Sequence, residues 1–388
     1  MNILLVHNIN AYQNDQISDE EIVYFNEISI LEKRLGQNNI HKYIAMNKNP
    51  SKISLFFNIW FNISHYFKIK KVIKEHKIDI VHVHNFFPLI TPSIFYGAKS
   101  MGVTTIQTLH SYGKYCLNKN FYYMGGSCVN CPTKGYIQGI KKKCYENSTL
   151  QSIAVTLVNY FYSFINYEKK IDAYFVLSNI QKNFMIEFDK TNTLKNKIFL
   201  KPNFIKMAQY DIKPEDKRDY IYIGRLEYQF GVQFLLDFWK TLPRNFILNI
   251  IGRGSLQNQI DKSRWSHINY IGRINYDDTP RYIAQSKYLI YPSLMYEASN
   301  TILIESMSLG TPVIAFNYGS RKEILKNAKN SFVVSLENFN DVIKKTKSVI
   351  GKEYQEISLN AKKFAMDYDE EVILDKQIEL YDKLLFSK

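Results

Sequence analysis

The chain has 388 residues, of which 46% are hydrophobic, and a formal net charge of +14. This length suits two domains with separate cores. No stretch reaches the roughly 18 consecutive apolar residues of a membrane span, and Met1 leads directly into a predicted strand. We therefore expect neither a transmembrane helix nor a signal peptide. Four cysteines without an export signal are typical of a reduced, cytoplasmic protein.

Predicted strands and helices alternate along the whole chain, which indicates parallel sheets covered by helices on both faces. In the first half, runs of β-forming residues predict strands at 3–7, 80–84, 104–109 and 173–177, and a long helix is predicted at 19–35. In the second half, strands are predicted at 220–223, 246–252, 268–271, 288–291, 313–316 and 331–334. The two series predict an α/β chain with two doubly wound domains.

A predicted hinge follows the first series, at Lys201-Pro202-Asn203, because the proline interrupts the pattern. It separates a first domain, residues 1–203, from a second, residues 204–369. A final helix is predicted at 370–388, with apolar residues at helical spacing. These are Leu374, Ile378, Tyr381 and Leu385.

All four cysteines lie in an insert of the first domain, at 111–147; they are Cys116, Cys128, Cys131 and Cys144. One Cys-x-x-Cys pair flanked by two single cysteines can form a structural zinc site of four thiolates. Such a site would order an insert that has little core of its own. Free thiols packed in an irregular loop are the alternative.

Positive charge is concentrated in residues 1–200, which hold 23 Lys and Arg against 13 Asp and Glu, a net +10 out of the total of +14. Lysines cluster at 68–77 and 141–143, beside two uncharged aromatic runs at 53–63 and 153–167. This combination suits an anionic membrane surface. The alternative is a pair of buried helices with a solvated basic rim. No nucleic-acid recognition motif accompanies the charge, so we expect no nucleic-acid partner.

Two glutamates eight residues apart, Glu297 and Glu305, flank the start of a helix predicted at 301–309. Ser299 or Asn300 is placed to cap that helix, whose first N–H groups favour an anion. Carboxylates beside an anion site can accept paired hydrogen bonds from sugar hydroxyls. On spacing alone, an equal alternative is that Glu297 caps a loop and Glu305 forms a surface ion pair.

The residues around this pair resemble the E-x7-E signature of glycosyltransferase family 4, the glycosyl transferases of group 1. Further motifs of the family occur in order along the chain. They are Met1-Asn-Ile-Leu-Leu-Val-His7-Asn8, Ile80-Val-His-Val-His84-Asn85, Thr108-Leu-His110, Val176-Leu-Ser178, Lys201-Pro-Asn203, Gly224-Arg225-Leu226, Ile251-Gly252-Arg-Gly254 and Gly319-Ser-Arg-Lys-Glu323. Each motif is weak alone, but their order and spacing together are specific.

The resemblance implies the GT-B fold, with two facing Rossmann-like domains, the active site in the cleft between them, and a last helix that crosses back to the first domain. It implies a retaining, metal-independent hexosyltransferase that needs no catalytic cofactor. A nucleotide sugar would be the donor and a glycan or lipid-linked saccharide the acceptor, as in bacterial capsule or O-antigen synthesis. We expect the enzyme in the cytoplasm, peripheral at the inner face of the plasma membrane.

The resemblance also assigns site residues. Arg225 would contact the donor diphosphate, Glu297 the donor sugar and His110 the reacting sugar, as the catalytic set. Donor binding would further use Glu305, Gly252, Gly254, Asn300, Thr301 and Ile302. The plain alternatives are a paired strand-end arginine, a satisfied strand-end histidine and an ordinary glycine turn. His82 and His84 share one face of their strand and are interpreted as structural.

The chain departs from the family in two places. Phe230 stands where the family has a lysine as second diphosphate contact, so Arg253 or Arg321 would have to compensate. The first loop, at 13–21, has no glycine, so its backbone cannot come as close to a phosphate. These departures leave two alternatives open: a non-catalytic nucleotide-sugar-binding subunit, and a GT-B epimerase or hydrolase of nucleotide sugars.

Overall fold

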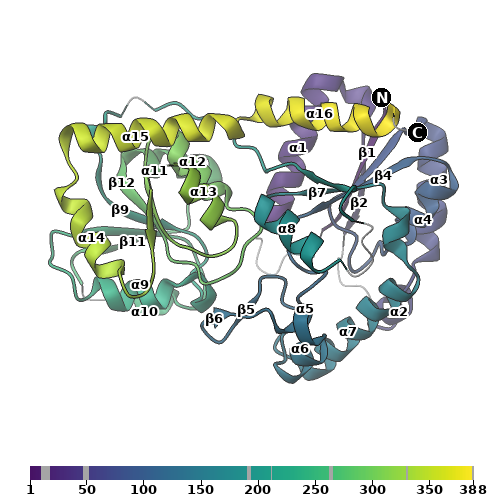
Figure 1. Ribbon diagram of the computed structural model, residues 1–388, viewed down its shortest axis with the longest axis horizontal. Helices are drawn as coiled ribbons and strands as arrows, with labels where there is room; N and C mark the ends of the chain where they lie inside the picture. The colour runs from purple at the N-terminus through teal and green to yellow at the C-terminus, as the bar shows by residue number, and fades with distance from the viewer. Residues whose placement is uncertain are drawn as a thin grey trace. The chain divides into compact units, whose positions relative to one another are not determined.

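The computed structural model describes residues 1–9, 18–46, 52–189, 194–210, 212–261, 265–328 and 331–386. These residues form two compact units, which are described separately. The first contains Met1–Lys119, Val129–Pro202 and Leu374–Lys388, and the second contains Asn120–Cys128 and Asn203–Ile373. In each unit, helices flank a parallel sheet (Figure 1). Most of the glycine-free first loop, residues 10–17, lies outside the described residues.

The first unit has a parallel sheet in the order β2-β1-β3-β4-β7-β8. Its strands are β1 (Ile3–Ile9), β2 (Ile40–Met46), β3 (Ile80–Val83), β4 (Thr104–Leu109), β7 (Ala173–Val176) and β8 (Ile198–Leu200). Its helices are α1 (Asp19–Leu35), α2 (Lys52–Asn58), α3 (Ile63–His76), α4 (Ser93–Ser100), α5 (Asn130–Lys134), α6 (Ile137–Lys141), α7 (Thr149–Phe164) and α8 (Asn179–Glu187). Strands β1, β3 and β7 are buried along their whole length, as expected when helices cover both faces.

Local chemistry explains where α1 begins and ends. Ser18 accepts a hydrogen bond from the Glu21 backbone N–H, while the Glu21 carboxylate accepts from the Ser18 N–H at 2.7 Å. This capping box satisfies two otherwise unpaired donors. At the other end Gly36 adopts φ 89°, which glycine reaches without strain. The helix has the predicted bounds.

The sequence patterns did not predict β2 and β8. In β2 only Ile40 and Ala45 are buried, and every second residue from Lys42 to Met46 is exposed. The strand is stabilised by pairing with β1, from Ile3 with Ile40 to Ile9 with Met46. The other strand, β8, has only three residues. Both lie at the edges of the sheet, where burial leaves the weakest pattern in the sequence.

The second unit has a parallel sheet in the order β11-β10-β9-β12-β13-β14. All six strands lie where they were predicted, as β9 (Arg218–Ile223), β10 (Leu248–Ile251), β11 (Ile268–Gly272), β12 (Ser286–Tyr291), β13 (Val313–Phe316) and β14 (Phe332–Val334). The helices are α9 (Val232–Trp239), α10 (Gln257–Asp261), α11 (Thr279–Gln285), α12 (Thr301–Ser308), α13 (Arg321–Ala328), α14 (Phe339–Ser348) and α15 (Gly351–Ala365).

This strand order is that of a doubly wound dinucleotide-binding fold, in which the connections reverse direction between the first and fourth strands. Here those strands are β9 and β12. Successive side chains of these strands belong to two different hydrophobic clusters. One contains Tyr220 and Tyr288, and the other contains Ile221 and Leu289. The two clusters are the cores on opposite faces of the sheet. Ligands bind such sheets in the crevice at the carboxyl ends of the two strands.

A short hairpin of the cysteine insert, β5 (Tyr122–Tyr123) with β6 (Gly126–Ser127), belongs to the second unit. The Tyr296 N–H donates to the Asn120 carbonyl at 2.9 Å, and the ring of Phe121 packs on Tyr296. The sequence had assigned the whole insert to the first domain. These contacts explain why 120–128 groups with the second unit instead.

The last helix, α16 (Glu370–Phe386), contributes its residues from Leu374 onward to the first unit. Arg34 on α1 donates to Asp375 at 2.6 Å. Tyr381 is fully buried, and its hydroxyl lies 2.7 Å from His82 Nδ1. Among the described residues, no helix is both long enough and apolar enough to cross a membrane.

Candidate functional site

In the second unit, Arg225 follows β9 at the carboxyl end of the sheet and is exposed. The Tyr222 hydroxyl donates to its carbonyl at 2.8 Å, which fixes the backbone at this point. Its guanidinium carbon lies 5.5 Å from the centre of the Phe230 ring. The residue that replaces the family lysine is therefore a cation–π partner of this arginine.

Two glycines of the neighbouring loop, Gly252 and Gly254, are required by backbone packing. A Cβ at Gly252 would lie 1.8 Å from the Gly224 carbonyl oxygen, and one at Gly254 would lie 2.3 Å from that of Leu226. The loops after β9 and β10 thus pass directly against each other. The sequence left two explanations for these glycines, donor binding and an ordinary turn, and did not predict this close contact between the loops.

Glu297 lies in the loop after β12 and is held by several donors. Its carboxylate accepts from the Tyr291 hydroxyl at 2.9 Å and the Asn300 amide at 2.9 Å, and it pairs with the Arg321 guanidinium. Arg321 is fully buried and also donates to three backbone carbonyls, those of Phe316, Ser293 and Met295. The guanidinium of Arg321 is therefore occupied by hydrogen bonds that hold this loop. It does not replace the lysine that the family has at position 230.

Glu305 lies on the second turn of α12 and is partly exposed. Its carboxylate accepts a hydrogen bond from the Tyr276 hydroxyl at 2.6 Å. Tyr276 is itself 52% exposed, so this hydrogen bond forms at the surface of the unit. The two glutamates of the motif thus have different surroundings: one is locked in a loop and the other is accessible.

The start of α12 differs from the prediction. Asn300 occupies the N-cap position, but its side chain does not accept from the helix. Instead it donates to Glu297 and accepts from the Ser320 hydroxyl at 2.9 Å. The predicted side-chain cap by Asn300 is wrong, because the loop requires this amide elsewhere. The first backbone N–H groups of the helix, at Thr301 and Ile302, consequently have no side-chain cap and suit an anion.

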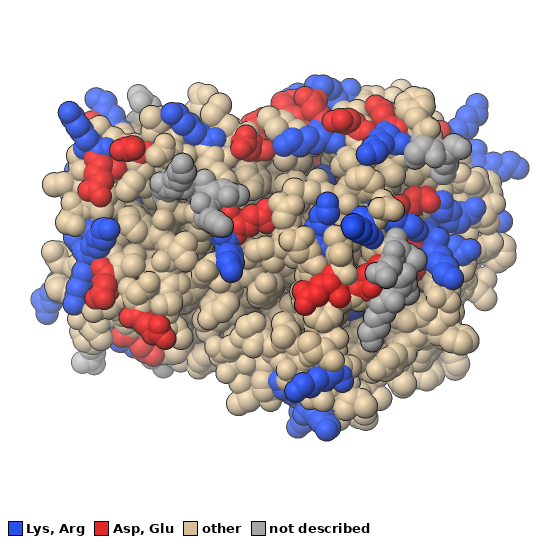
Figure 2. All heavy atoms as spheres, viewed as in Figure 1, with Lys and Arg blue, Asp and Glu red and all other residues tan. Residues whose placement is uncertain are grey.

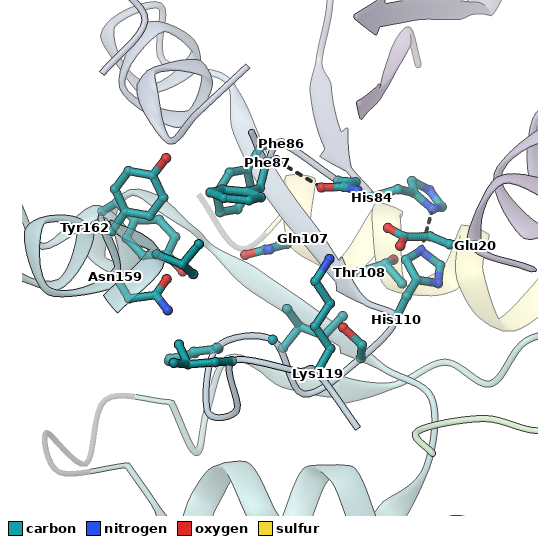
Figure 3. A pocket seen from close by; sticks show the side chains of 18 of the residues that line it. Glu20, His84, Phe86, Phe87, Gln107, Thr108, His110, Lys119, Asn159 and Tyr162 are labelled. Atoms are coloured by element: carbon teal, nitrogen blue, oxygen red, sulfur yellow. Dashed lines mark hydrogen bonds between the residues drawn. The ribbon is translucent and has the colours of Figure 1, made fainter. Parts of the chain in front are cut away.

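In the first unit, His110 follows β4 and lines a pocket of about 140 Å³. Figure 3 shows Glu20, His84 and His110 at one end of this pocket and Asn159 and Tyr162 of α7 at the other, with Gln107 and Lys119 between them. Gln107 is 7% exposed, and its Oε1 has no hydrogen-bond partner. The pocket therefore offers an unsatisfied acceptor, a second amide, an ammonium group and aromatic walls.

Titratable groups near His110 are shifted by burial. Burial raises the pKa of Glu20 to about 7, although the ammonium of Lys119 opposes this rise. Burial, followed by the neighbouring His84, holds the pKa of His110 well below its usual range. The His84 Nδ1 and His110 Nε2 atoms lie 2.9 Å apart. At neutral pH His110 is therefore uncharged and is placed to exchange hydrogen bonds.

The structure thus distributes the predicted residues over both units. The second unit brings Arg225, Gly252, Gly254 and the glutamates, with residues 300–302, to the carboxyl ends of its strands. His110 lies in the first unit. Sequence reasoning missed the pocket residues Gln107, Lys119, Asn159 and Glu20. Only Gln107 gave a signal, as a long polar side chain inside the predicted strand 104–109.

The four cysteines are all described and form no disulfide. Within the described residues, the only group of three metal-binding side chains with ligand atoms within 4.8 Å of one another contains no cysteine. Cys128 falls in the second unit and the other three in the first. Zinc binding stays a prediction: purified protein should contain about one zinc per chain by elemental analysis. Folded protein free of zinc would refute it.

Family models match both halves of the chain. Residues 205–364 match the "Glycosyl transferases group 1" family, and residues 41–130 match "Glycosyltransferase Family 4". Together these matches span well over half of the chain. The chain belongs to this glycosyltransferase family. The predicted family is therefore confirmed, and the residues that carry the E-x7-E motif lie inside the group 1 match.

Several curated relatives of this glycosyltransferase are similar in sequence. A Klebsiella pneumoniae protein described as "uncharacterized 41.2 kDa protein in cps region" is 24% identical over 283 residues, covering 71% of this chain and 70% of its own. An uncharacterised glycosyltransferase of Methanocaldococcus jannaschii is 28% identical over 42% of this chain and 48% of its own. An Escherichia coli O-antigen chain mannosyltransferase B is 27% identical over 28% of this chain and 31% of its own. The chain thus spans less than half the length of the last two relatives.

Solved structures establish the fold. Sucrose-phosphate synthase from Thermosynechococcus elongatus matches with a TM-score of 0.66 at 13% identity, over 100% of both chains. The Anabaena protein HepE, solved in complex with UDP-glucose, matches with a TM-score of 0.65 at 15% identity, over 99% of this chain and 100% of its own. The predicted GT-B fold of this glycosyltransferase is confirmed.

Proposed function

We propose that this glycosyltransferase is a retaining, metal-independent hexosyltransferase of surface polysaccharide synthesis, which transfers a sugar from a nucleotide donor to a glycan or lipid-linked saccharide. The observation that carries the proposal is the grouping of Arg225, the uncapped start of α12 and Glu305 at the carboxyl ends of β9 and β12. The relatives from a cps region and from O-antigen synthesis support the biological setting.

The chemistry of transfer assigns a role to each group. When the bond between sugar and diphosphate breaks, negative charge grows on the leaving diphosphate. A guanidinium binds phosphate oxygens bidentately, and the N–H groups at a helix start bind them through the backbone. Together Arg225 and α12 would supply this stabilisation, with no step assigned to a metal ion. The accessible carboxylate of Glu305 would accept hydrogen bonds from the nucleoside, and Glu297 would face the donor sugar.

The pocket beside His110 is the proposed site for the acceptor sugar. Its aromatic walls, from Phe86 and Tyr162, suit the apolar faces of a pyranose ring. The buried Gln107 oxygen, which has no partner, can accept from a sugar hydroxyl, and Asn159 can donate and accept. Since an unpaired buried oxygen costs about 1–3 kcal/mol, a hydroxyl that satisfies it would bind with specificity.

Glu305→Ala tests the donor site. We expect it to weaken binding of the nucleotide sugar by about tenfold, because it removes charged hydrogen bonds worth about 1.5–3 kcal/mol in total. Isothermal titration calorimetry with the UDP- or GDP-sugar that most raises the melting temperature would measure this. The control is Glu356→Ala, at an exposed glutamate on α15 outside the family motifs. Equal affinity for wild type and Glu305→Ala would exclude the nucleoside role, and tight binding without transfer to any acceptor would favour a non-catalytic subunit.

Peripheral membrane association is proposed from the two faces of α7. Its outward face exposes an apolar stripe at helical spacing, whereas the opposite face contributes Val155, Asn159 and Tyr162 to the pocket. The stripe consists of Leu150, Ile153, Leu157, Tyr160 and Phe164. On the adjoining α2, Phe56 and Phe57 are also exposed, at 63% and 70%. In Figure 2 the surface at the position of α7 is mostly uncharged, and Lys and Arg side chains lie beside it, at the position of α6. The aromatic runs are therefore not simply buried helices.

Binding to anionic vesicles should weaken as salt rises, and should fall at least about tenfold in the variant Lys70→Glu/Lys71→Glu/Lys74→Glu, since each lysine near the surface contributes roughly 1 kcal/mol. Vesicle co-sedimentation would measure this. The matched control, Lys344→Glu/Lys345→Glu/Lys352→Glu, makes the same charge change on α14 and α15 of the second unit. A protein that ignores anionic vesicles at low salt would indicate a soluble acceptor.

A further inference from the structure

A buried carboxylate lies behind the pocket of the first unit. Glu27 of α1 has no exposed surface and forms an ion pair with Lys201, which is equally buried. The Gln377 amide of α16 donates to its Oε1 at 2.6 Å. Burial opposes the charge, but the Lys201 ammonium holds the pKa of Glu27 well below its usual range. The group is therefore an ionised carboxylate in a low-dielectric interior.

His84 lies between this carboxylate and His110. Its Nε2 is 3.5 Å from Glu27 Oε1, and its Nδ1 is 2.9 Å from His110 Nε2. The two ring planes are nearly parallel, with centroids 5.1 Å apart and an interplanar angle of 24°, and the rings meet edge to edge through these nitrogens. Glu27, His84 and His110 thus form a chain of contacts from the core to the pocket. The two histidines, seen side by side in Figure 3, are hydrogen-bonded, whereas the buried Nε2 of His84 has no hydrogen-bond partner among the described residues and is in electrostatic contact with Glu27 at 3.5 Å.

The neighbouring His82 does not take part in this chain. It also lies 3.5 Å from Glu27, but both of its nitrogens already have partners, the Tyr381 hydroxyl at 2.7 Å and the Thr108 hydroxyl at 2.7 Å. Glu27, His82 and His84 are close enough to hold a metal ion. However, Lys201 and Gln377 already donate to the carboxylate and His82 has no free nitrogen. The cluster is therefore a hydrogen-bond network rather than a metal cage.

The order of charges determines where the protons lie. A negative carboxylate favours the imidazole tautomer whose proton lies on the nitrogen that faces it, which for His84 is Nε2, 3.5 Å from Glu27 Oε1. Its Nδ1 must then accept, and His110 must donate from Nε2. A neutral imidazole has one proton, so His110 Nδ1 is left as an acceptor.

We propose that Glu27 and His84 are positioning residues that fix His110 as the tautomer with an unprotonated Nδ1, ready to accept a hydrogen bond from a sugar hydroxyl. This inference rests on the proposed function for its catalytic meaning. Without His84, His110 could protonate either nitrogen, and one of the two forms would donate where the substrate also donates.

The tautomer can be read directly from long-range ¹H–¹⁵N spectra of the full chain labelled in its 8 histidines, with His110→Gln to assign the signal. We expect a protonated Nε2 and an unprotonated Nδ1 in the wild type. In Glu27→Gln this preference should be lost. Because that variant leaves Lys201 buried and unpaired, Glu27→Gln/Lys201→Met provides a neutral pair in case the single variant does not fold.

Activity supplies the second measurement. His84→Leu should lower kcat for sugar transfer by about tenfold or more, since a positioned proton acceptor contributes roughly 10²–10⁴-fold. His84→Asn should recover most of the loss, because its side-chain oxygen can accept near the Nδ1 position. Tyr381→Phe, which removes a hydroxyl of the same cluster without touching His84 or His110, should leave kcat unchanged.

The outcomes separate the two proposals. His110 protonated at Nδ1 in the wild type overturns the inference, whatever the activity. Equal kcat for His84→Leu and the wild type also overturns it. A protein that transfers no sugar contradicts the proposed function, and the inferred tautomer is then still tested by the spectrum alone.

Discussion

Arg225→Ala is expected to lower turnover by about 10²- to 10³-fold, the size of effect seen when one preorganised donor to a developing negative charge is removed. Donor binding should weaken much less, because the diphosphate gains most of its charge as the bond to the sugar breaks. Measuring kcat beside calorimetric donor affinity would separate the two effects. Arg244→Ala is the control, because this exposed arginine lies in the loop before β10, at the opposite end of the sheet. If affinity and turnover fell equally, Arg225 would only bind the donor in the ground state and would not stabilise the transition state selectively.

Substitutions at Phe230 test the same site with a smaller expected effect on turnover, because they alter the surroundings of Arg225 and leave the arginine in place. Phe230→Leu keeps an apolar side chain but removes the cation–π contact, which is worth about 0.5–1 kcal/mol at an exposed site. We therefore expect turnover to fall only by about twofold to fivefold. Phe230→Lys, which restores the family residue, tests whether the lost cation limits the rate. A rise in kcat would mean that it does.

Arg321→Met is expected to lower the free energy of unfolding of the second unit by about 3–5 kcal/mol, the usual cost of leaving one partner of a buried ion pair alone. Glu297 and three carbonyls would lose their shared donor. Urea unfolding followed by tryptophan fluorescence would detect the change, because Trp239 is buried in the same unit.

The double variant Glu297→Gln/Arg321→Met removes the unpaired charge as well. It should recover part of the stability but not the turnover, since Glu297 is proposed to face the donor sugar. If Arg321→Met alone is as stable as the wild type, the loop does not depend on the ion pair. The buried arginine would then require another explanation.

Local pattern was enough to predict most of the fold. The six strands of the second unit are short apolar runs between turn residues, and burial on both faces makes such runs conspicuous. The edge strand β2 was not predicted, because His41 and Lys42 interrupt the apolar run by which the buried strands are recognised. Helix α1 was predictable to the residue because its capping box and Gly36 are encoded within a few positions of each end.

The site was predictable in position but not in its contacts. Arg225 and Glu297 were found because each directly follows a strand, or lies in the loop beyond one, in a recognisable motif. The ion pair between Glu297 and Arg321, however, depends on how the loops after β12 and β13 fold over each other. The pocket is likewise formed by β4 and α7, which are adjacent only after folding. Asn300 does not cap α12, because its side-chain amide binds Glu297 and Ser320 instead. These contacts, too, form only when the chain folds.

The contribution of α16 to the first unit has a consequence for biosynthesis. A ribosome makes residues 1–202 first, then all of Asn203–Ile373, and only afterwards Gln377 and Tyr381. Until then Glu27 lacks the Gln377 amide and His82 lacks the Tyr381 hydroxyl, so the interior of the earlier unit stays incomplete during synthesis. The second unit is complete in sequence before the first, which reverses the usual order in which domains fold on the ribosome. Nascent chains stalled before residue 374 should therefore be far more sensitive to protease in 1–202 than in 203–373.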